Sequence, residues 1–245
     1  MAIIIASACV VNCISDRKLD TKMDRTKNRP LPSGEVSVRG AIIYAVVLLI
    51  IGIAIIISLS NAVVLLCVLA GHFTYTVVYG YVKRHSWTST MVGTVPGALP
   101  VLAGFATVSP NLPVEAWLLS LLILVWQLPH FYGLSLYRRS DYAKSGLPLL
   151  SIVKSKEVVV KHIVLTVLLY AVVAILLLAY LPQVARYGTG LIVIGALWWA
   201  WFIVFSKDRG SDGWARQVFG KSLLLSLVFL AAGMSAVLIR LVSGA

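Results

Sequence analysis

Seven long apolar runs constrain the fold of this chain more than any other feature. They cover residues 40–59, 62–82, 90–108, 114–136, 158–181, 188–205 and 222–242. A helix needs about 20 mainly apolar residues to cross about 30 Å of hydrocarbon. Only helices and closed barrels satisfy every backbone hydrogen bond there. We therefore predict an all-α fold, a polytopic transmembrane helical bundle with seven full spans.

The first eleven residues are apolar as well, but they are too few for a crossing. At a rise of about 1.5 Å per residue they make roughly half a span. They lack the basic start and small-residue cleavage site of a signal peptide. We interpret them as a truncated N-terminal half-helix at the start of a single membrane domain, residues 1–245.

The net charge of +12 follows the expected topology. If the spans alternate and the first connector is cytoplasmic, nineteen of the twenty-one Lys and Arg residues fall on the inner side, and only Arg186 and Arg240 fall outside. This is the positive-inside distribution of a cell-membrane protein. The charge therefore predicts no nucleic-acid partner, and it puts the working surface on the cytoplasmic side.

An acidic row lies in the first polar connector. Asn12, Asp16, Asp20 and Asp24 recur every four residues, so in a helix their oxygens share one face. Carboxylates at this spacing repel one another unless a cation lies among them. Hard oxygen ligands suit Mg²⁺, which takes one or two carboxylates and is usually completed by substrate phosphates.

Basic residues follow the acidic row directly. Arg25, Lys27 and Arg29 provide the fixed positive charge that a phosphate-bearing ligand requires. The two groups together indicate Mg²⁺ and a diphosphate. The alternative is a solvated, mixed-charge loop, and the charge pattern alone does not exclude it.

A second polar cluster occupies residues 126–151. His130 lies inside an otherwise apolar span, and Arg138 and Asp141 open another connector on the same side of the membrane as the first. Two such connectors on one face suit a two-sided diphosphate site. Alternatively, Asp141 pairs with Arg138 or Lys144 at the membrane surface, where ion pairs are weak.

Other residues receive structural interpretations. We expect Pro30 and Pro32, with Ser33 and Gly34, to stop any helix and turn the chain. We expect a neighbouring helix to provide the hydrogen-bond partner of His72. Tryptophans 198, 199 and 201, with Tyr187, are typical of interfacial or lipid-facing positions.

Three motifs together resemble a known family. They read NxxxDRxxDxxMxRTKNRPL from Asn12, WQxPHF from Trp126 and YRxxDYxxxGxP from Tyr137. They are similar to those of the protoheme IX farnesyltransferases, or haem O synthases, in the UbiA superfamily of intramembrane prenyltransferases. The match runs from the first residues to at least Ser151 and includes the Lys-Arg pair that begins at Lys83.

The resemblance implies a helical bundle around a cavity open to the membrane. It implies Mg²⁺ as cofactor, and farnesyl diphosphate, haem B and the bilayer as partners, with a haem A synthase as a further candidate. The reaction would be farnesyl transfer to a vinyl group of haem B with addition of water, giving haem O and diphosphate.

Carried over position by position, the resemblance also implies site residues. The metal ligands, acting through diphosphate, would be Asn12, Asp16, Asp20 and Asp141. The catalytic residues would be Asp16, Asp20, His130 and Asp141. The substrate-binding residues would be Asn12, Arg25, Lys27, Arg29, Lys83, Tyr137 and Arg138.

Three alternatives remain at this point. The first is a UbiA-type prenyltransferase with a quinone precursor or another aromatic acceptor, which WQLPHF disfavours. The second is a transporter or channel, for which charges along several spans would be expected. The third is an inactive truncated homologue, because the family has a complete helix pair before the acidic motif and a helix and a half are missing here.

Overall fold

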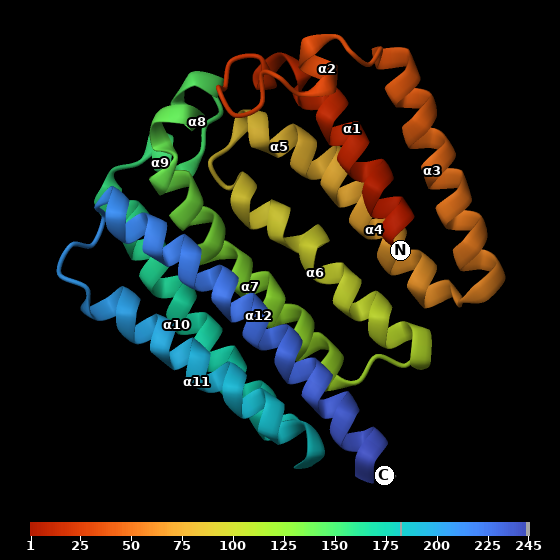
Figure 1. Cartoon of the computed structure of the whole chain (residues 1–245), viewed down its shortest axis with the longest axis vertical. Coiled ribbons are helices and arrows are strands. Elements are labelled where there is room, and N and C mark those ends of the chain that lie inside the picture. Colours follow the sequence, from red (N-terminus) through yellow and green to blue (C-terminus); the bar gives the residue numbers. More distant parts are fainter. Residues whose placement is uncertain (182, 244–245) are drawn as a thin grey trace. The chain divides into compact units, whose positions relative to one another are not determined.

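The computed structural model describes residues 1–181 and 183–243, without the side chains of residues 183–187 and 235–243. Every regular element in the described residues is a helix (Figure 1). The chain divides into two compact units. The first comprises Met1–Leu112 with Arg138–Val153, and the second comprises Pro113–Tyr137 with Lys154–Ala245.

The predicted number of spans is confirmed. Within the described residues, seven helices are long and apolar enough to cross a membrane. Many of their large apolar side chains are exposed, as expected for surfaces that face lipid. The chain is a multi-pass membrane protein.

The first unit contains nine helical elements among its described residues. They are α1 (Ala2–Asp20), α2 (Pro30–Ser33), α3 (Val38–Leu59), α4 (Ala62–Phe73), the π-helix η1 (Thr74–Tyr79), α5 (Gly80–His85), α6 (Ser89–Val108), α8 (Arg139–Ser145) and α9 (Leu150–Val153). Helix α1 packs beside α3, and α4 packs beside α6 (Figure 1). Gly52 permits the first contact, because a Cβ there would lie 2.3 Å from Ile4 Cγ1.

The acidic row lies on α1 only in part. The helix continues from the apolar start of the chain through Asp20, so Asn12, Asp16 and Asp20 do share a helical face. Asp24 lies beyond the helix end, in a turn. The last member of the repeat therefore lies four residues beyond the end of the helix.

The prediction that residues 30–34 stop any helix holds for Gly34 and is wrong for the two prolines, which lie inside a helix. Pro30 begins the one-turn helix α2, and Gly34, with φ of 84°, ends it. Proline suits the first position of a helix because its φ is already helical and its missing N–H would be unpaired there. Glycine suits the left-handed conformation that follows.

A π-helix interrupts the second span, and the sequence analysis did not predict it. It places Tyr75 and Tyr79 in a stack with ring centroids 5.5 Å apart. Such wide turns change the face that the following helix presents and occur frequently at functional sites. Here the following helix is α5, which carries Lys83. The prediction for His72, just before η1, is confirmed, because its Nε2 lies 3.3 Å from Ser7 Oγ on α1.

The second unit is a four-helix bundle. Its helices are α7 (Val114–Tyr137), α10 (Lys156–Tyr180), α11 (Gln183–Phe205) and α12 (Asp212–Ser243). Packing is cyclic, with α7 against α10 and α12, and α11 against the same two helices. Trp199, Trp214 and Tyr132 are fully buried in this bundle. Trp198 and Trp201 are exposed, so the lipid-facing interpretation is wrong for Trp199 alone, and Tyr187 lies outside the described side chains.

Helix α12 begins about ten residues before the predicted span. Its first turns contain Arg216 and Lys221, which the hydropathy pattern had placed in a connector. The Arg216 guanidinium lies 5.9 Å from the Tyr137 ring centroid, and Lys221 Nζ lies 4.6 Å from that of Trp198. Cation–π contacts and long apolar stems allow such side chains to lie on a helix next to the membrane surface.

Candidate diphosphate and metal site

Lys83 brings the first acidic motif together. Its Nζ donates hydrogen bonds to Asn12 Oδ1 at 2.6 Å and to Asp16 Oδ2 at 2.7 Å. The Lys83 side chain is only 3% exposed. A buried ammonium therefore supplies the cation that the row of acidic residues requires, from a helix 67 residues further along the chain.

A second cation lies on the other side of Asp16. Arg84 donates to the Ser15 carbonyl oxygen at 2.7 Å, and its Nη2 lies 3.6 Å from Asp16 Oδ1. The Oδ1 atom is buried and has no hydrogen-bond partner among the described residues. Asp16 thus accepts its hydrogen bond through Oδ2, while Oδ1 has only the ion pair with Arg84.

Asp20 is held by a separate pair. Its carboxylate is almost fully buried, and Arg29 Nη1 donates to Oδ2 at 3.2 Å. The Thr26 hydroxyl donates to the Asp20 carbonyl oxygen at 3.0 Å, which folds the intervening turn back onto the end of α1. Arg29 therefore contacts the acidic motif directly, through Asp20, as the sequence predicts.

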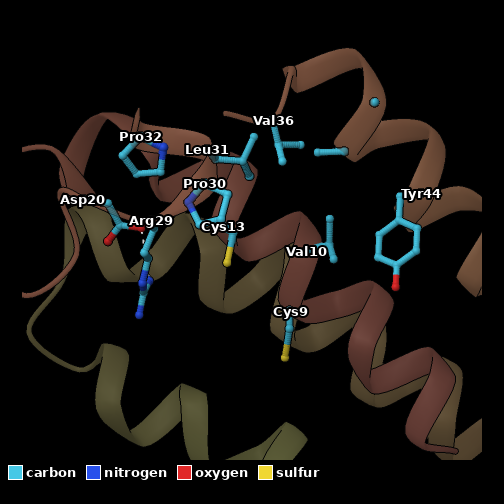
Figure 2. A pocket seen from close by; sticks show the side chains of 12 residues that line it. Cys9, Val10, Cys13, Asp20, Arg29, Pro30, Leu31, Pro32, Val36 and Tyr44 are labelled. Carbon is cyan, nitrogen blue, oxygen red and sulfur yellow. Dashed lines mark hydrogen bonds and ion pairs between the residues drawn. The ribbon is translucent and has the colours of Figure 1, made fainter. Parts of the chain in front are cut away.

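A cavity of about 740 Å³ opens beside the Asp20–Arg29 pair. Figure 2 shows Pro30, Leu31 and Val36 on one side of it, with Cys9 and Cys13 along α1. Charge is confined to the end where Asp20 and Arg29 lie. This combination of an apolar lining and a charged end suits an amphipathic molecule with a hydrocarbon chain.

Asp24 has different surroundings. It is exposed, and it accepts hydrogen bonds from Lys27 at 3.1 Å and from Lys144 on α8. The bond from Lys144, followed by that from Lys27, lowers the pKa of Asp24, and Asp24 in turn raises the pKa of Lys144. This ion pair links the first connector to α8. Arg25 is exposed and is not part of it.

Asp141 lies on α8 in the same unit, after Arg138 at the helix N-cap. Its Oδ1 is buried without a hydrogen-bond partner in the part of the chain that the structure describes. Lys144 forms its ion pair with Asp24, while Asp141 acts on Lys144 as a weaker electrostatic neighbour. A buried, unpaired carboxylate oxygen is costly, which points to a ligand.

The carboxylates of the first unit fit a magnesium ion that takes its other ligands from a phosphate-bearing molecule. No group of three or more His, Cys, Asp or Glu side chains within the described residues could hold a metal alone. Mg²⁺ typically uses one or two carboxylates and takes its other ligands from water and phosphate. The Oδ1 atoms of Asp16 and Asp141, which accept no hydrogen bond from the described residues, match that donor set.

His130 and Tyr137 belong to the second unit. Nδ1 of His130 lies 2.7 Å from Ser222 Oγ, and its ring stacks on Trp126 with centroids 4.9 Å apart. Trp126 Nε1 also donates to the Ser222 carbonyl oxygen at 3.2 Å. Ser222 was missed by the sequence analysis, because a single serine in an apolar span carries no recognisable pattern.

A model of the UbiA prenyltransferase family matches residues 1–229, and the chain belongs to this family. Among curated relatives, the protoheme IX farnesyltransferase of Aliivibrio salmonicida is 36% identical over 94% of this chain and 79% of its own. Protoheme IX farnesyltransferase 2 of Chromobacterium violaceum is 35% identical over 91% of this chain and 75% of its own. The predicted family is confirmed.

Solved structures share the fold. A digeranylgeranylglyceryl phosphate synthase superposes with a TM-score of 0.74 at 18% identity, over 96% of this chain and 81% of its own. A UbiA homologue from Archaeoglobus fulgidus, bound to GPP and Mg²⁺, gives 0.68 at 17% identity, over 94% of this chain and 84% of its own. These structures confirm the predicted UbiA-type helical bundle.

Proposed function

We propose that this protein is a haem O synthase, which transfers the farnesyl group of farnesyl diphosphate to a vinyl group of haem B. The observation that carries the proposal is the 36% identity to a protoheme IX farnesyltransferase over nearly the whole chain. The geometry of the first unit supports the donor half of the reaction. Lys83 and Arg29 provide positive charge beside Asp16 and Asp20, as a diphosphate–metal complex requires.

Asn12, Asp16, Asp20 and Asp141 are the proposed ligands of Mg²⁺ through the diphosphate. The bound ion would neutralise the charge that develops on the leaving group. Lys83 would orient Asn12 and Asp16, and Arg29 would orient Asp20, before the substrate binds. Arg25, Lys27 and Arg138 are proposed as further contacts to the diphosphate, and Tyr137 as a further substrate-binding residue.

The bond between the allylic carbon and the diphosphate oxygen breaks, and the electron pair leaves with diphosphate. The terminal vinyl carbon of haem B bonds to the allylic carbon, which leaves a cation on the carbon next to the porphyrin ring. Water adds there and loses a proton, giving the hydroxyethylfarnesyl group. The bilayer location limits premature capture of the allylic cation by water.

The basic connectors support an orientation in the cell membrane with the site on the cytoplasmic side. Acidic residues of both connectors lie in the first unit, where Asp24 of the first connector contacts Lys144 of α8. A haem A synthase, which would use the product, is the proposed protein partner.

Expression in a bacterial strain that lacks its own haem O synthase tests the function. Extracted haems are separated by chromatography and identified by mass. We expect haem O with this chain and haem B alone with Asp16→Asn, at equal levels of inserted protein. Haem B alone with the unmodified chain would contradict the proposal. The same test asks whether residues 1–245 suffice as one functional domain.

A further inference from the structure

Ser222 determines which nitrogen of His130 carries the proton. The Ser222 hydroxyl lies 2.5 Å from the Phe219 carbonyl oxygen and 2.7 Å from His130 Nδ1. A hydroxyl has one proton, and a carbonyl oxygen can only accept. The Ser222 proton is therefore donated to Phe219, and its oxygen accepts the N–H of His130 Nδ1.

The other ring nitrogen, Nε2, consequently carries a lone pair. Within the described residues, the structure gives the His130 ring no hydrogen bond besides the one to Ser222. Three aromatic rings lie next to it: Trp126 stacks on it, and Phe131 and Phe219 lie with ring centroids 4.9 Å away. None of these described neighbours donates a hydrogen bond to Nε2.

The position of Ser222 is itself fixed. Its side chain is fully buried, and its carbonyl oxygen accepts the indole N–H of Trp126, one helical turn before His130 on α7. Helices α7 and α12 approach closely here, because a Cβ on Gly133 would lie 2.9 Å from Val218 Cγ1. Trp126 and His130, both part of the WQLPHF motif, thus meet the same residue of α12.

We propose that His130 Nε2 is the axial ligand of the iron in the haem B substrate, with Ser222 as a positioning residue that holds the ring and its tautomer. Metal-binding histidines generally donate their other N–H to a neighbouring acceptor in this way, and haem iron is commonly held by histidine. This inference rests on the proposed function, since it takes haem B as the acceptor.

The hydrogen-bond partner of His130 Nδ1 distinguishes an iron ligand from a general base. A histidine that accepts a proton becomes a cation, and in catalytic triads a carboxylate at the other nitrogen stabilises that cation. His130 has a neutral hydroxyl there and apolar rings around it. These surroundings favour a neutral imidazole, which is the form that binds a metal.

Haem titration of the purified protein tests the proposal without farnesyl diphosphate or turnover. The intact chain, in nanodiscs, is titrated with ferric and ferrous haem B and followed by absorption and resonance Raman spectroscopy. We expect a histidine–iron stretching band in the ferrous protein. His130→Gly should lose this band and regain an imidazole–iron band when imidazole is added, which also shows that the variant is folded.

Ser222→Ala should keep a histidine-ligated spectrum but bind haem roughly tenfold to a hundredfold more weakly, with a shifted iron–nitrogen frequency. Ser226→Ala is the matched control, because Ser226 lies one turn further along α12 and, among the described residues, bonds only Leu223 O of its own helix. It should match the unmodified chain.

An unchanged iron–histidine band in His130→Gly would overturn the assignment. An unchanged frequency and affinity in Ser222→Ala would overturn the role of Ser222. Haem O production by the intact chain combined with either result would leave the proposed function standing. If the intact chain neither binds haem B nor makes haem O, both proposals fail.

Discussion

The ammonium of Lys83 lies 2.7 Å from Asp16 Oδ2 and is almost inaccessible to solvent. A lysine of another helix is therefore the counter-ion of the first acidic motif. Asn12 shares the same ammonium. These contacts hold two proposed metal ligands in place before any metal or diphosphate binds, which lowers the cost of organising the site.

Replacement of Lys83 by Met should destabilise the protein by about 1–3 kcal/mol, because it leaves the Asp16 carboxylate without its hydrogen-bonded cation. Thermal unfolding in detergent measures the effect. Arg84→Met is the control, since Arg84 is 40% exposed and lies further from Asp16, at 3.6 Å. It should cost less than about 1 kcal/mol. Equal melting temperatures for the two variants would contradict the structural importance of Lys83.

Asp141→Asn should separate stability from activity. Oδ1 of Asp141 is buried without a hydrogen-bond partner in the described structure, so removing the charge should not lower the melting temperature. Turnover should fall by at least roughly a hundredfold if Asp141 is a ligand through Mg²⁺. The readouts are unfolding temperature and haem O formation. A variant with normal turnover would remove Asp141 from the site.

Arg29→Ala should chiefly weaken binding of farnesyl diphosphate, because Arg29 is half-exposed next to the buried Asp20 and can reach an anion. Loss of a charge-assisted contact of about 1.5–3 kcal/mol would raise KM roughly tenfold to a hundredfold. Steady-state kinetics with varied farnesyl diphosphate measure it. Lys22→Ala, an exposed cation of the same connector, should leave KM unchanged. Similar KM values for both variants would argue against a specific role of Arg29.

The contribution of the Asp24–Lys144 pair to stability should depend on pH and salt, but the pair should not control turnover. The pKa of Asp24 is lowered from its ordinary 3.8, so its stabilising contribution is present above that value and is lost as pH falls through the lowered pKa. The pKa of Lys144 is raised from 10.5, so its contribution is present below that value and is lost as pH rises through the raised pKa.

The difference in melting temperature between the unmodified chain and Asp24→Asn should therefore be constant from about pH 5 to 9. Because the pair is exposed, this difference in melting temperature should become smaller in about 1 M salt. Haem O formation by Asp24→Asn should match that of the unmodified chain. Loss of turnover comparable to Asp16→Asn would show instead that Asp24 is a ligand.

The sequence alone determined the class of fold. Hydropathy identified seven spans because crossing the hydrocarbon requires length and apolar character, and both are local properties. The four-residue spacing placed Asn12, Asp16 and Asp20 on one helical face. It failed at Asp24, because the helix ends at Asp20 and the next residues form turns.

Tertiary structure decided which side chains meet. Lys83 reaches Asp16 across 67 residues, and Ser222 reaches His130 across 92, and no local pattern encodes either contact. Hydropathy also could not tell that Trp199 is buried while Trp198 faces outward. Lipid tails and the interior of a bundle are both apolar, so composition selects helices that cross the membrane, and only packing decides which face of each helix meets protein.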